Sequence, residues 1–256
     1  MKLIHVAVEG FKRFEEPSRM NLDGKVVAIV VPNEAGKSSF QQLLSHWNDS
    51  DEFAATGGQQ ELTREATIDA EQLIVECSFE LESDDKEAIA EIPEAVDVRW
   101  IEIGKYAKVG KLPCTLNPTP QRSLSQRESA LSALRTAFSD DTSNLDVRLI
   151  QQTGDEEHPD QSSAHALLEL LDTDAQTLGK RAISVIVSAA NEFETLAENA
   201  GLREYQRLAE QLRQLAEHER AEHPDAAARH ILFRRRPEFL FFSDAARSLQ
   251  SEYDLT

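Results

Sequence analysis

The stretch KVVAIVVPNEAGKSSFQQLL, from Lys25 to Leu44, decides how the chain is interpreted. Its apolar run Val26–Val30 predicts a buried strand, the polar residues that follow predict a turn, and the residues from Ser39 onward predict a helix. Strand, turn and helix in this order are typical of a phosphate-binding loop, in which backbone N–H groups at the helix start converge on phosphate oxygens. We therefore expect a nucleotide site in this stretch.

The residues of the turn have expected roles in such a site. Gly36 lets the backbone approach the ligand, Lys37 supplies a mobile positive charge for the β- and γ-phosphates, and Ser38 offers its hydroxyl to a magnesium ion. These residue types predict ATP and Mg²⁺ as the cofactors. The expected binding residues are Asn33, Glu34, Ala35, Gly36, Lys37, Ser38 and Ser39.

Val31 departs from the pattern G-x-x-x-x-G-K-[ST], because it stands where the first glycine is expected. A β-branched residue accepts extended geometry but resists a positive φ, so the loop must begin in an extended conformation or carry strain. The alternative is an ordinary helix start in which Ser38 or Ser39 is the capping residue. The strand before the turn and the apolar positions after it favour the nucleotide site.

The segment from Lys2 to Leu44 resembles the N-terminus of the RecF/SMC/OLD-like group of ABC-type ATPases. Members begin with a strand, an N-F-[KR]-x-F-like turn, a second strand and a loop of the form G-P-N-E-A-G-K-S; here the turn is Gly10–Phe14. The resemblance implies that Lys12 and Arg13 contact the phosphates, with a solvated hairpin tip as the alternative. It also implies that a glutamine reaches the magnesium and the γ-phosphate, and Gln72 is the candidate.

Hydrophobic periodicity predicts the remaining elements. Alternating positions indicate strands, and apolar residues at steps of three and four indicate helices. The expected strands are Lys2–Glu9, Arg19–Leu22 pairing with Val26–Val30, Leu73–Leu81 and Val96–Gly104, with Lys105–Lys111 completing a hairpin; the expected helices are Arg122–Phe138, Ser162–Leu171, Lys180–Ala200 and Leu202–Ala221.

With the resemblance, these elements predict an α/β fold: the N-terminal lobe of an ABC-type P-loop NTPase with a mixed β-sheet and an antiparallel β-layer, followed by a helical region. The expected domains are residues 1–118 as the ATPase lobe, 119–232 as the helical region and 233–256 as a return strand and C-terminal segment. The helix from Leu202 to Ala221 is expected to be amphipathic on a core, with a longer antiparallel arm as the alternative.

Composition limits the classes of function. A formal net charge of −19 over 256 residues argues against a general nucleic-acid-binding surface, which needs clustered lysine and arginine. Cys77 in a strand and Cys114 in a loop lack C-x-x-C spacing, so they are expected to be free thiols of a reducing compartment. No signal peptide is present and no apolar run approaches the roughly 18 residues that span a bilayer, so we expect a cytoplasmic protein without a membrane partner.

The other motifs of an ABC-type ATPase are not identifiable in this chain. Thr56–Gln60 is similar to the L-S-G-G-Q signature but lies too close to Lys37, and Phe239–Asp244 lacks the second acid of an acidic strand. No catalytic residue is therefore identified, and ATPase activity is expected only when a C-terminal lobe or a partner completes the site. The cluster Arg234–Arg236 is expected to be solvated, with DNA or a partner's carboxylates as the alternative.

The resemblance implies an ATP-binding lobe that acts in DNA repair, recombination or anti-phage defence, with ATP-driven closure of two heads. The implied partners are a second copy or another ATPase head, and DNA with a nuclease. Two alternatives stay open at this point: a small kinase-like P-loop enzyme, and an interaction module in which Val31 marks a degraded loop that no longer binds nucleotide.

Overall fold

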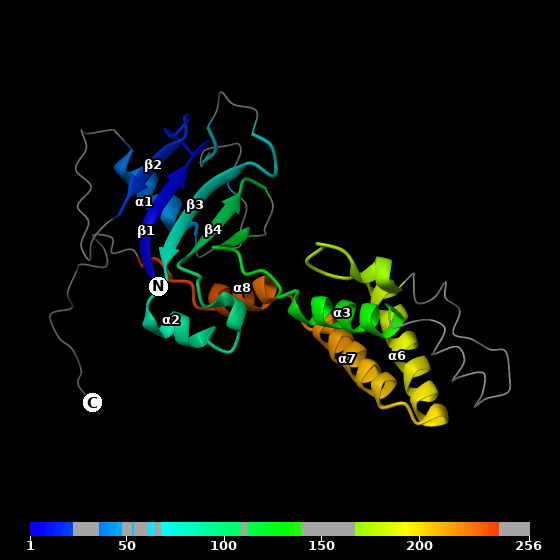
Figure 1. Cartoon of the computed structure of the whole chain (residues 1–256). Coiled ribbons are helices and arrows are strands. Elements are labelled where there is room, and N and C mark those ends of the chain that lie inside the picture. Colours follow the sequence, from blue (N-terminus) through cyan, green and yellow to red (C-terminus); the bar gives the residue numbers. More distant parts are fainter. Residues whose placement is uncertain are drawn as a thin grey trace, which may run out of the picture. The chain divides into compact units, whose positions relative to one another are not determined.

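The structure is a computed structural model that describes residues 1–22, 36–47, 53, 61–63, 68–108, 112–139 and 167–240. The chain forms two compact units (Figure 1). The first unit contains Met1–Pro120 and the residues from Ala227 onward, and the second contains Gln121–Ala226. The second unit is therefore an insertion in the sequence of the first.

A five-stranded sheet in the order β2-β1-β3-β4-β5 forms the first unit. Every neighbouring pair of strands is antiparallel. The register pairs Val6 with Cys77 and Cys77 with Ile103, so these side chains share one face of the sheet. The strands are β1 (Lys2–Val8), β2 (Ser18–Asn21), β3 (Leu73–Glu80), β4 (Trp100–Tyr106) and β5 (Cys114–Asn117).

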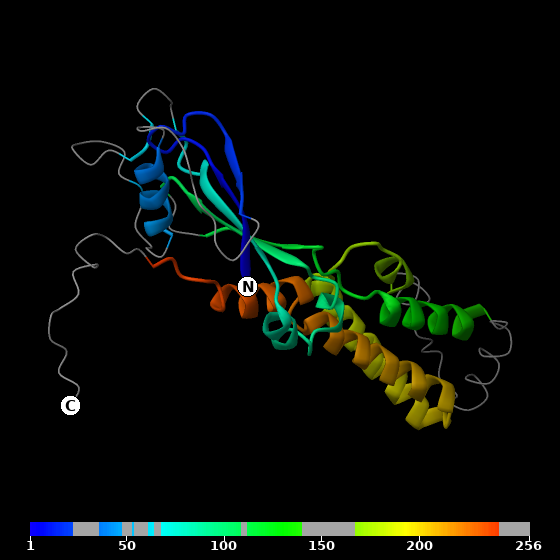
Figure 2. The ribbon, with the colours of Figure 1, turned by 90° about the vertical axis from the view of Figure 1, so that its left-hand side faces the viewer.

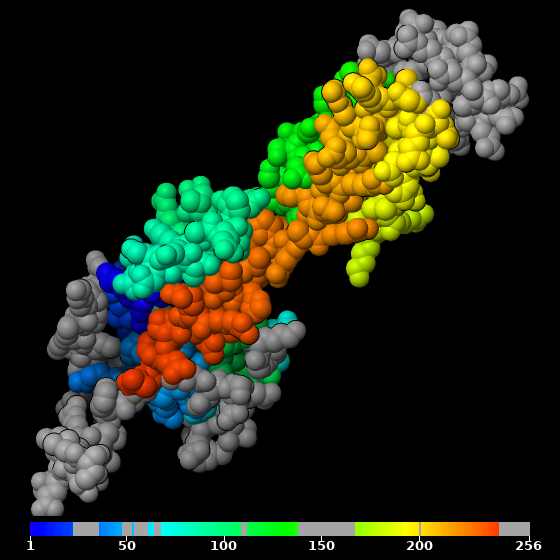
Figure 3. Space-filling model, turned by 90° about the horizontal axis from the view of Figure 1, so that it is seen from below, coloured from blue at the N-terminus to red at the C-terminus, as the bar shows by residue number. Residues whose placement is uncertain are grey.

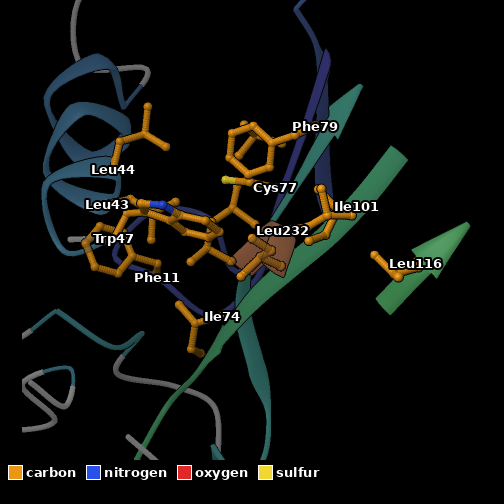
Figure 4. Close-up of a cluster of buried hydrophobic side chains, with 14 of the residues drawn as sticks. Phe11, Leu43, Leu44, Trp47, Ile74, Cys77, Phe79, Ile101, Leu116 and Leu232 are labelled. Atoms are coloured by element: carbon orange, nitrogen blue, oxygen red, sulfur yellow. The ribbon is translucent and has the colours of Figure 1, made fainter. Parts of the chain in front are cut away.

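Helices α1 (Lys37–Ser45) and α8 (Pro224–Arg234) contribute to the same apolar core as the sheet. In Figure 4, Trp47 and Leu43 lie against side chains of the sheet, and Leu232 of α8 lies among them. Trp47 is 1% exposed, and its ring centroid lies 5.8 Å from that of Phe79. Burying one such leucine side chain stabilises the fold by about 1.5–3 kcal/mol, so this core fixes α1 against the sheet. Figure 2 shows α1 along one face of the sheet.

Two short helical elements, α2 (Ser83–Ala88) and η1 (Pro93–Ala95), connect β3 to β4. The side chain of Glu82 and that of Asp85 form a capping box at the start of α2. Both side chains also bind the ammonium group of Met1, with N···O distances of 2.8 Å and 2.6 Å. The start of α2 is thus closed by groups of the protein itself.

The second unit is helical and has its own core. It contains α3 (Ser125–Ser139), α6 (Lys180–Ala200) and α7 (Arg203–Arg220). Gly201 adopts the left-handed conformation, with φ at 65°, and ends α6, so that α7 can return along it. The steps of three and four in α7 bury Tyr205, Leu208, Leu212 and Leu215, as expected for an amphipathic helix on a core.

A buried ion pair joins three segments of the second unit. Arg127 on α3 donates to Oε1 of Glu219 on α7 at 2.6 Å, and the two side chains are 3% and 1% exposed. Arg127 also donates to the carbonyl oxygens of Thr173 and Ala175, and the other oxygen of Glu219 accepts from the Leu178 N–H at 3.1 Å. The segment that leads into α6 is therefore bound to both α3 and α7.

Arg122 makes a second set of contacts in this unit. Its guanidinium, on a residue that is 4% exposed, donates to the carbonyl oxygens of His218 and Ala221. These carbonyls belong to the last turn of α7, where a positive charge is favourable. The contact holds the first residues of the unit beside its last residues.

Several predicted elements differ from the structure. The predicted strand Val96–Gly104 begins only at Trp100, because Pro93–Ala95 forms a 3₁₀ turn and Val96 is 75% exposed. Strand β2 pairs with β1, whereas Val26–Val30, its predicted partner, lies outside the described residues. In the described part of the predicted C-terminal segment 233–256, α8 continues to Arg234 and residues 235–240 form no strand. Residues 241–256 lie outside the described residues, so the return strand stays a prediction.

The predicted α/β fold class is confirmed, because the structure combines an antiparallel sheet with helices. The described strands form no parallel pair, so the predicted mixed sheet is not found among them. The P-loop NTPase fold stays a prediction, because Val26–Val30 lies outside the described residues. No helix in the described ranges is both long enough and apolar enough to cross a bilayer.

Both cysteines are free thiols, as predicted. Cys77 is buried in β3, and burial together with the nearby Glu76 raises the pKa of its thiol. Cys114 was expected in a loop, but it lies on β5 and pairs with Ile103. A four-residue edge strand that leads into a proline is too short for periodicity to reveal.

Candidate phosphate-binding site

Helix α1 begins directly after Gly36, its N-cap residue. Gly36 has φ at 98° and ψ at 13°, a left-handed conformation that residues with a side chain adopt rarely. The Phe40 N–H donates to the Gly36 carbonyl at 2.8 Å and closes the first turn. Because Lys37 and Ser38 are already helical, the alternative in which Ser38 or Ser39 caps the helix is wrong.

The first turn of α1 presents donors to its surroundings. Among the described residues, no side chain caps this helix and no acidic residue lies in its first turn. The N–H groups of Lys37, Ser38 and Ser39 precede the first i to i−4 hydrogen bond and so can donate outside the helix. Lys37 and Ser38 are exposed and Ser39 is half-buried. Three such donors, the helix dipole and one lysine suit a phosphate group.

The turn Gly10–Phe14 lies beside α1, as the predicted role of Lys12 requires. Gly10 and Lys12 both have positive φ, 72° and 49°, and the Gly10 N–H donates to the Phe14 carbonyl at 2.6 Å. A Cβ atom on Gly36 would lie 3.5 Å from the Phe14 ring, so the turn touches the start of the helix. Lys12 Nζ donates to Oε1 of Gln42 on α1.

Lys12 is therefore fixed on α1, whereas Arg13 is exposed at the same turn. Contact of Lys12 and Arg13 with a phosphate stays a prediction. Gln72 lies directly before β3, and its Nε2 is 3.3 Å from the place where a Cβ atom on Gly10 would stand. Its side chain thus lies against the turn that carries Lys12, and its proposed contact with magnesium also stays a prediction. Asn33, Glu34 and Ala35 lie outside the described residues.

Glu61, His46 and Gln42 form a polar cluster at α1 that the sequence did not predict. Glu61, only 6% exposed, pairs with Nε2 of His46, and Nε2 of Gln42 lies 3.5 Å from the same carboxylate oxygen. His46 also lies in a cluster of rings, with centroids 5.5 Å from Phe53 and 6.4 Å from Phe11. No local pattern pairs residue 61 with α1, so only the folded chain brings these groups together.

Lys105, the first residue of the predicted hairpin Lys105–Lys111, lies on β4 instead. Its side chain is 2% exposed and donates to the His46 carbonyl at 2.7 Å. Its Nζ also lies 4.9 Å from the centroid of the Phe53 ring. The period of two along Ile101, Ile103 and Lys105 points all of them inward, so this signal was present in the sequence. Lys105 thus places a positive charge at the C-terminal end of α1.

The arginine cluster Arg234–Arg236 is engaged within the first unit rather than merely solvated. Arg235 Nε donates to Oδ1 of Asp85 at 3.0 Å, and the Arg236 guanidinium lies 4.6 Å from the centroid of the Phe233 ring. Figure 3 shows the α2 segment, in teal, beside the end of α8, in red. Two of the three arginines therefore have partners in the protein, which weakens the alternative of DNA binding by this cluster.

Asp85 is a buried carboxylate with three donors. Burial raises the pKa of Asp85, but hydrogen bonds from the Met1 ammonium, Arg235 and the Glu82 N–H outweigh burial, so the pKa lies below its usual range. Burial lowers the pKa of the Met1 amino group, whereas Asp85 and Glu82 raise it, and the net change is upward. Asp85 thus joins the N-terminus, the start of α2 and the residue after α8 through its hydrogen bonds.

Comparison with known proteins gives a short likeness in sequence. No family model matches the chain. A segment of 44 residues, 17% of this chain, is 48% identical to the chromosome partition protein Smc of Mesomycoplasma hyorhinis. The likeness is to an SMC protein. The segment covers 4% of that protein, so the chain spans only a small part of its relative's length. The match gives weak support for an SMC/ABC-like ATP-binding family.

Proposed function

We propose that residues 33–39, together with Lys12 and Arg13, bind the phosphates of ATP with Mg²⁺, in the ATP-binding lobe of an SMC-like, ABC-type ATPase. One observation carries the proposal: the left-handed Gly36 starts α1 at a turn whose N–H groups no described side chain caps. The motif A-G-K-S supplies Lys37 and Ser38 at this turn, and the short likeness to Smc supports the same chemistry.

The proposed lobe needs a second body for hydrolysis. No catalytic acid or signature motif is identified in the sequence, so the missing groups would come from a C-terminal lobe, from a second copy or from another ATPase head. ATP bound at α1 would then close two heads on each other, which is a symmetric arrangement when the heads are identical. The isolated chain should therefore bind ATP and hydrolyse it slowly or not at all.

We also propose that the ATP-binding lobe acts in a process that involves DNA. The relative's printed name refers to chromosome partition, and repair, recombination and defence against foreign DNA are the processes we consider. The net charge of −19 and the engagement of Arg235 and Arg236 within the protein argue that contact with DNA would be made by a partner rather than by this chain.

Calorimetry tests the phosphate site. We expect the wild-type chain to bind ATP with micromolar affinity in the presence of Mg²⁺, and Lys37→Ala to lose detectable binding, because the lysine charge is the strongest single contact with the phosphates. Circular dichroism must show that both proteins are folded. Absence of heat with folded wild type would overturn the proposal and favour the interaction module with a degraded loop.

A further inference from the structure

We infer that Gln42 is a positioning residue, which holds the Lys12 ammonium beside α1 as a second fixed cation of the phosphate site. The inference rests on the proposed function. It concerns a residue that neither the motif nor the likeness to Smc identifies, because Gln42 lies beyond the loop and reads in the sequence as an ordinary surface position of the helix.

The place of Gln42 on α1 is the first argument. Residue 42 follows Ser38 by four positions and Ser39 by three, so all three lie on one face of the helix. Lys12 Nζ donates to the Gln42 amide, whose nitrogen lies 3.5 Å from the Glu61 carboxylate. The Lys12 ammonium is therefore held at the face of α1 on which Ser38 and Gln42 lie.

The surroundings of the amide are the second argument. Its oxygen meets the Lys12 ammonium, and its nitrogen lies 3.5 Å from the Glu61 carboxylate, which His46 also binds. An amide can accept from a cation with its oxygen and face a carboxylate with its nitrogen, so its orientation is determined by its neighbours. A carboxylate at position 42 would face Glu61 and neutralise Lys12.

The backbone of Lys12 is held by the same segment as the amide. The Lys12 N–H donates to the Glu61 carbonyl at 2.7 Å, and the Thr63 hydroxyl donates to the Lys12 carbonyl at 3.1 Å. The Thr63 N–H donates to the Gly10 carbonyl at 2.9 Å. Both the backbone and the side chain of Lys12 are thus held by groups of the protein, so the position of its charge is set before an anion arrives.

A double-mutant cycle tests this inference. We would measure the affinity for Mg²⁺ and ATP by calorimetry in wild type, Lys12→Ala, Gln42→Ala and the double variant. We expect Lys12→Ala to weaken binding by about 10-fold, Gln42→Ala by about 5-fold, and the double variant to bind like Lys12→Ala, because Gln42 acts through Lys12. Gln41→Ala is the matched control: Gln41 is the exposed neighbour on the same helix, and its affinity should equal wild type.

Further variants distinguish a positioning role of Gln42 from a purely structural one. Gln42→Glu should bind ATP more weakly than Gln42→Ala, since it adds a carboxylate beside Glu61. Thermal unfolding reports any loss of stability, but a purely structural role would weaken binding whether or not Lys12 is present. Wild-type affinity in Gln42→Ala, or independent effects in the cycle, would overturn the inference alone. Absence of ATP binding by folded wild type would overturn the proposed function and the inference with it.

Discussion

Helices α1 and α6 both begin with a lysine that follows a glycine, yet the two starts are built differently. Gly36 before α1 has φ at 98°, whereas Gly179 before α6 has φ at −66° and ψ at 159°. A Cβ atom on Gly179 would find nothing within 4 Å, so many residues would fit there. Only the start of α1 requires glycine, because only there is the backbone left-handed.

The two starts are alike in one respect, because no described side chain caps either helix. Just before α6, the Leu178 N–H donates to Glu219, and Arg127 holds that carboxylate in place, but Leu178 lies outside the helix. The dipeptide Gly-Lys therefore does not make a site by itself. The left-handed backbone of Gly36 is the feature that distinguishes the start of α1 from that of α6.

The largest expected effect concerns the ion pair of Arg127 and Glu219 beside the start of α6. Arg127→Met should lower the free energy of unfolding of the second unit by about 3–5 kcal/mol, because it leaves Glu219 charged, buried and without its cation. Chemical denaturation followed by circular dichroism measures the loss. Arg135→Met removes the exposed pair with Asp172, whose side chains are 59% and 65% exposed, and should cost less than about 1 kcal/mol. Equal losses would contradict the prediction.

The two lysines provide the next test. Lys37→Ala should weaken binding of ATP with Mg²⁺ by at least about 100-fold, equivalent to about 2.7 kcal/mol, because a charge beside the phosphates is removed. Lys180→Ala, at the corresponding position of α6, should leave the affinity unchanged. Calorimetry on both variants decides the matter, and a similar loss in Lys180→Ala would show that the two helix starts are equivalent.

The two glycines should respond in opposite directions. Gly36→Ser should destabilise the first unit by about 1–2 kcal/mol, because serine resists the left-handed conformation even though the Phe14 ring leaves ordinary contact space. Gly179→Ser should be neutral or stabilising by a few tenths of a kcal/mol, because serine is a better N-cap than glycine. Thermal unfolding of the pair measures both changes, and destabilisation by Gly179→Ser would break the comparison.

The smallest expected effect concerns α2, a third helix start, which Glu82 and Asp85 close. The pKa of Asp85 is lowered in the folded state. Ionised Asp85 therefore contributes fully to the free energy of unfolding above the usual aspartate pKa of about 3.9, and this contribution is lost as the pH falls through the pKa of the folded protein. The amino group of Met1 has a raised pKa, so its contribution is present below about pH 8 and is lost as the pH rises above that.

Asp85→Asn should therefore differ most from wild type in free energy of unfolding near neutral pH, and the difference should shrink below about pH 4. Denaturant titrations across this pH range measure the gap. Asp84→Asn changes the exposed neighbour in the same helix and should stay within about 0.5 kcal/mol of wild type. A gap for Asp85→Asn that does not depend on pH would count against the role of its ionisation.

Sequence reasoning found the elements with strong periodicity. β1, β3, α6 and α7 lie close to their predicted bounds, because each has a clear period of two or of three to four residues. It missed β5, which is only four residues long, and it assigned Lys105 to the hairpin after β4, although its alternation with Ile103 indicates an inward position on the same strand.

The residues of the candidate site also fall into a local group and a long-range group. The sequence predicted Gly36, Lys37 and Ser38 as phosphate-site residues, because their motif is local. Gln42 and Glu61 were not, because their interaction joins residues 19 positions apart and depends on how the segment around Glu61 packs on α1. Long-range polar contacts of this kind leave no periodic signal in one sequence.

The contact of Arg122 with the carbonyls of His218 and Ala221 has a consequence for how this protein could evolve. It holds the first and the last residues of the second unit close together, so the inserted helices form a unit whose two ends are adjacent. An insertion of this kind can be lengthened, exchanged or removed by recombination with little change to the sequence of the first unit, whose β5 and α8 lie on either side of it in the chain.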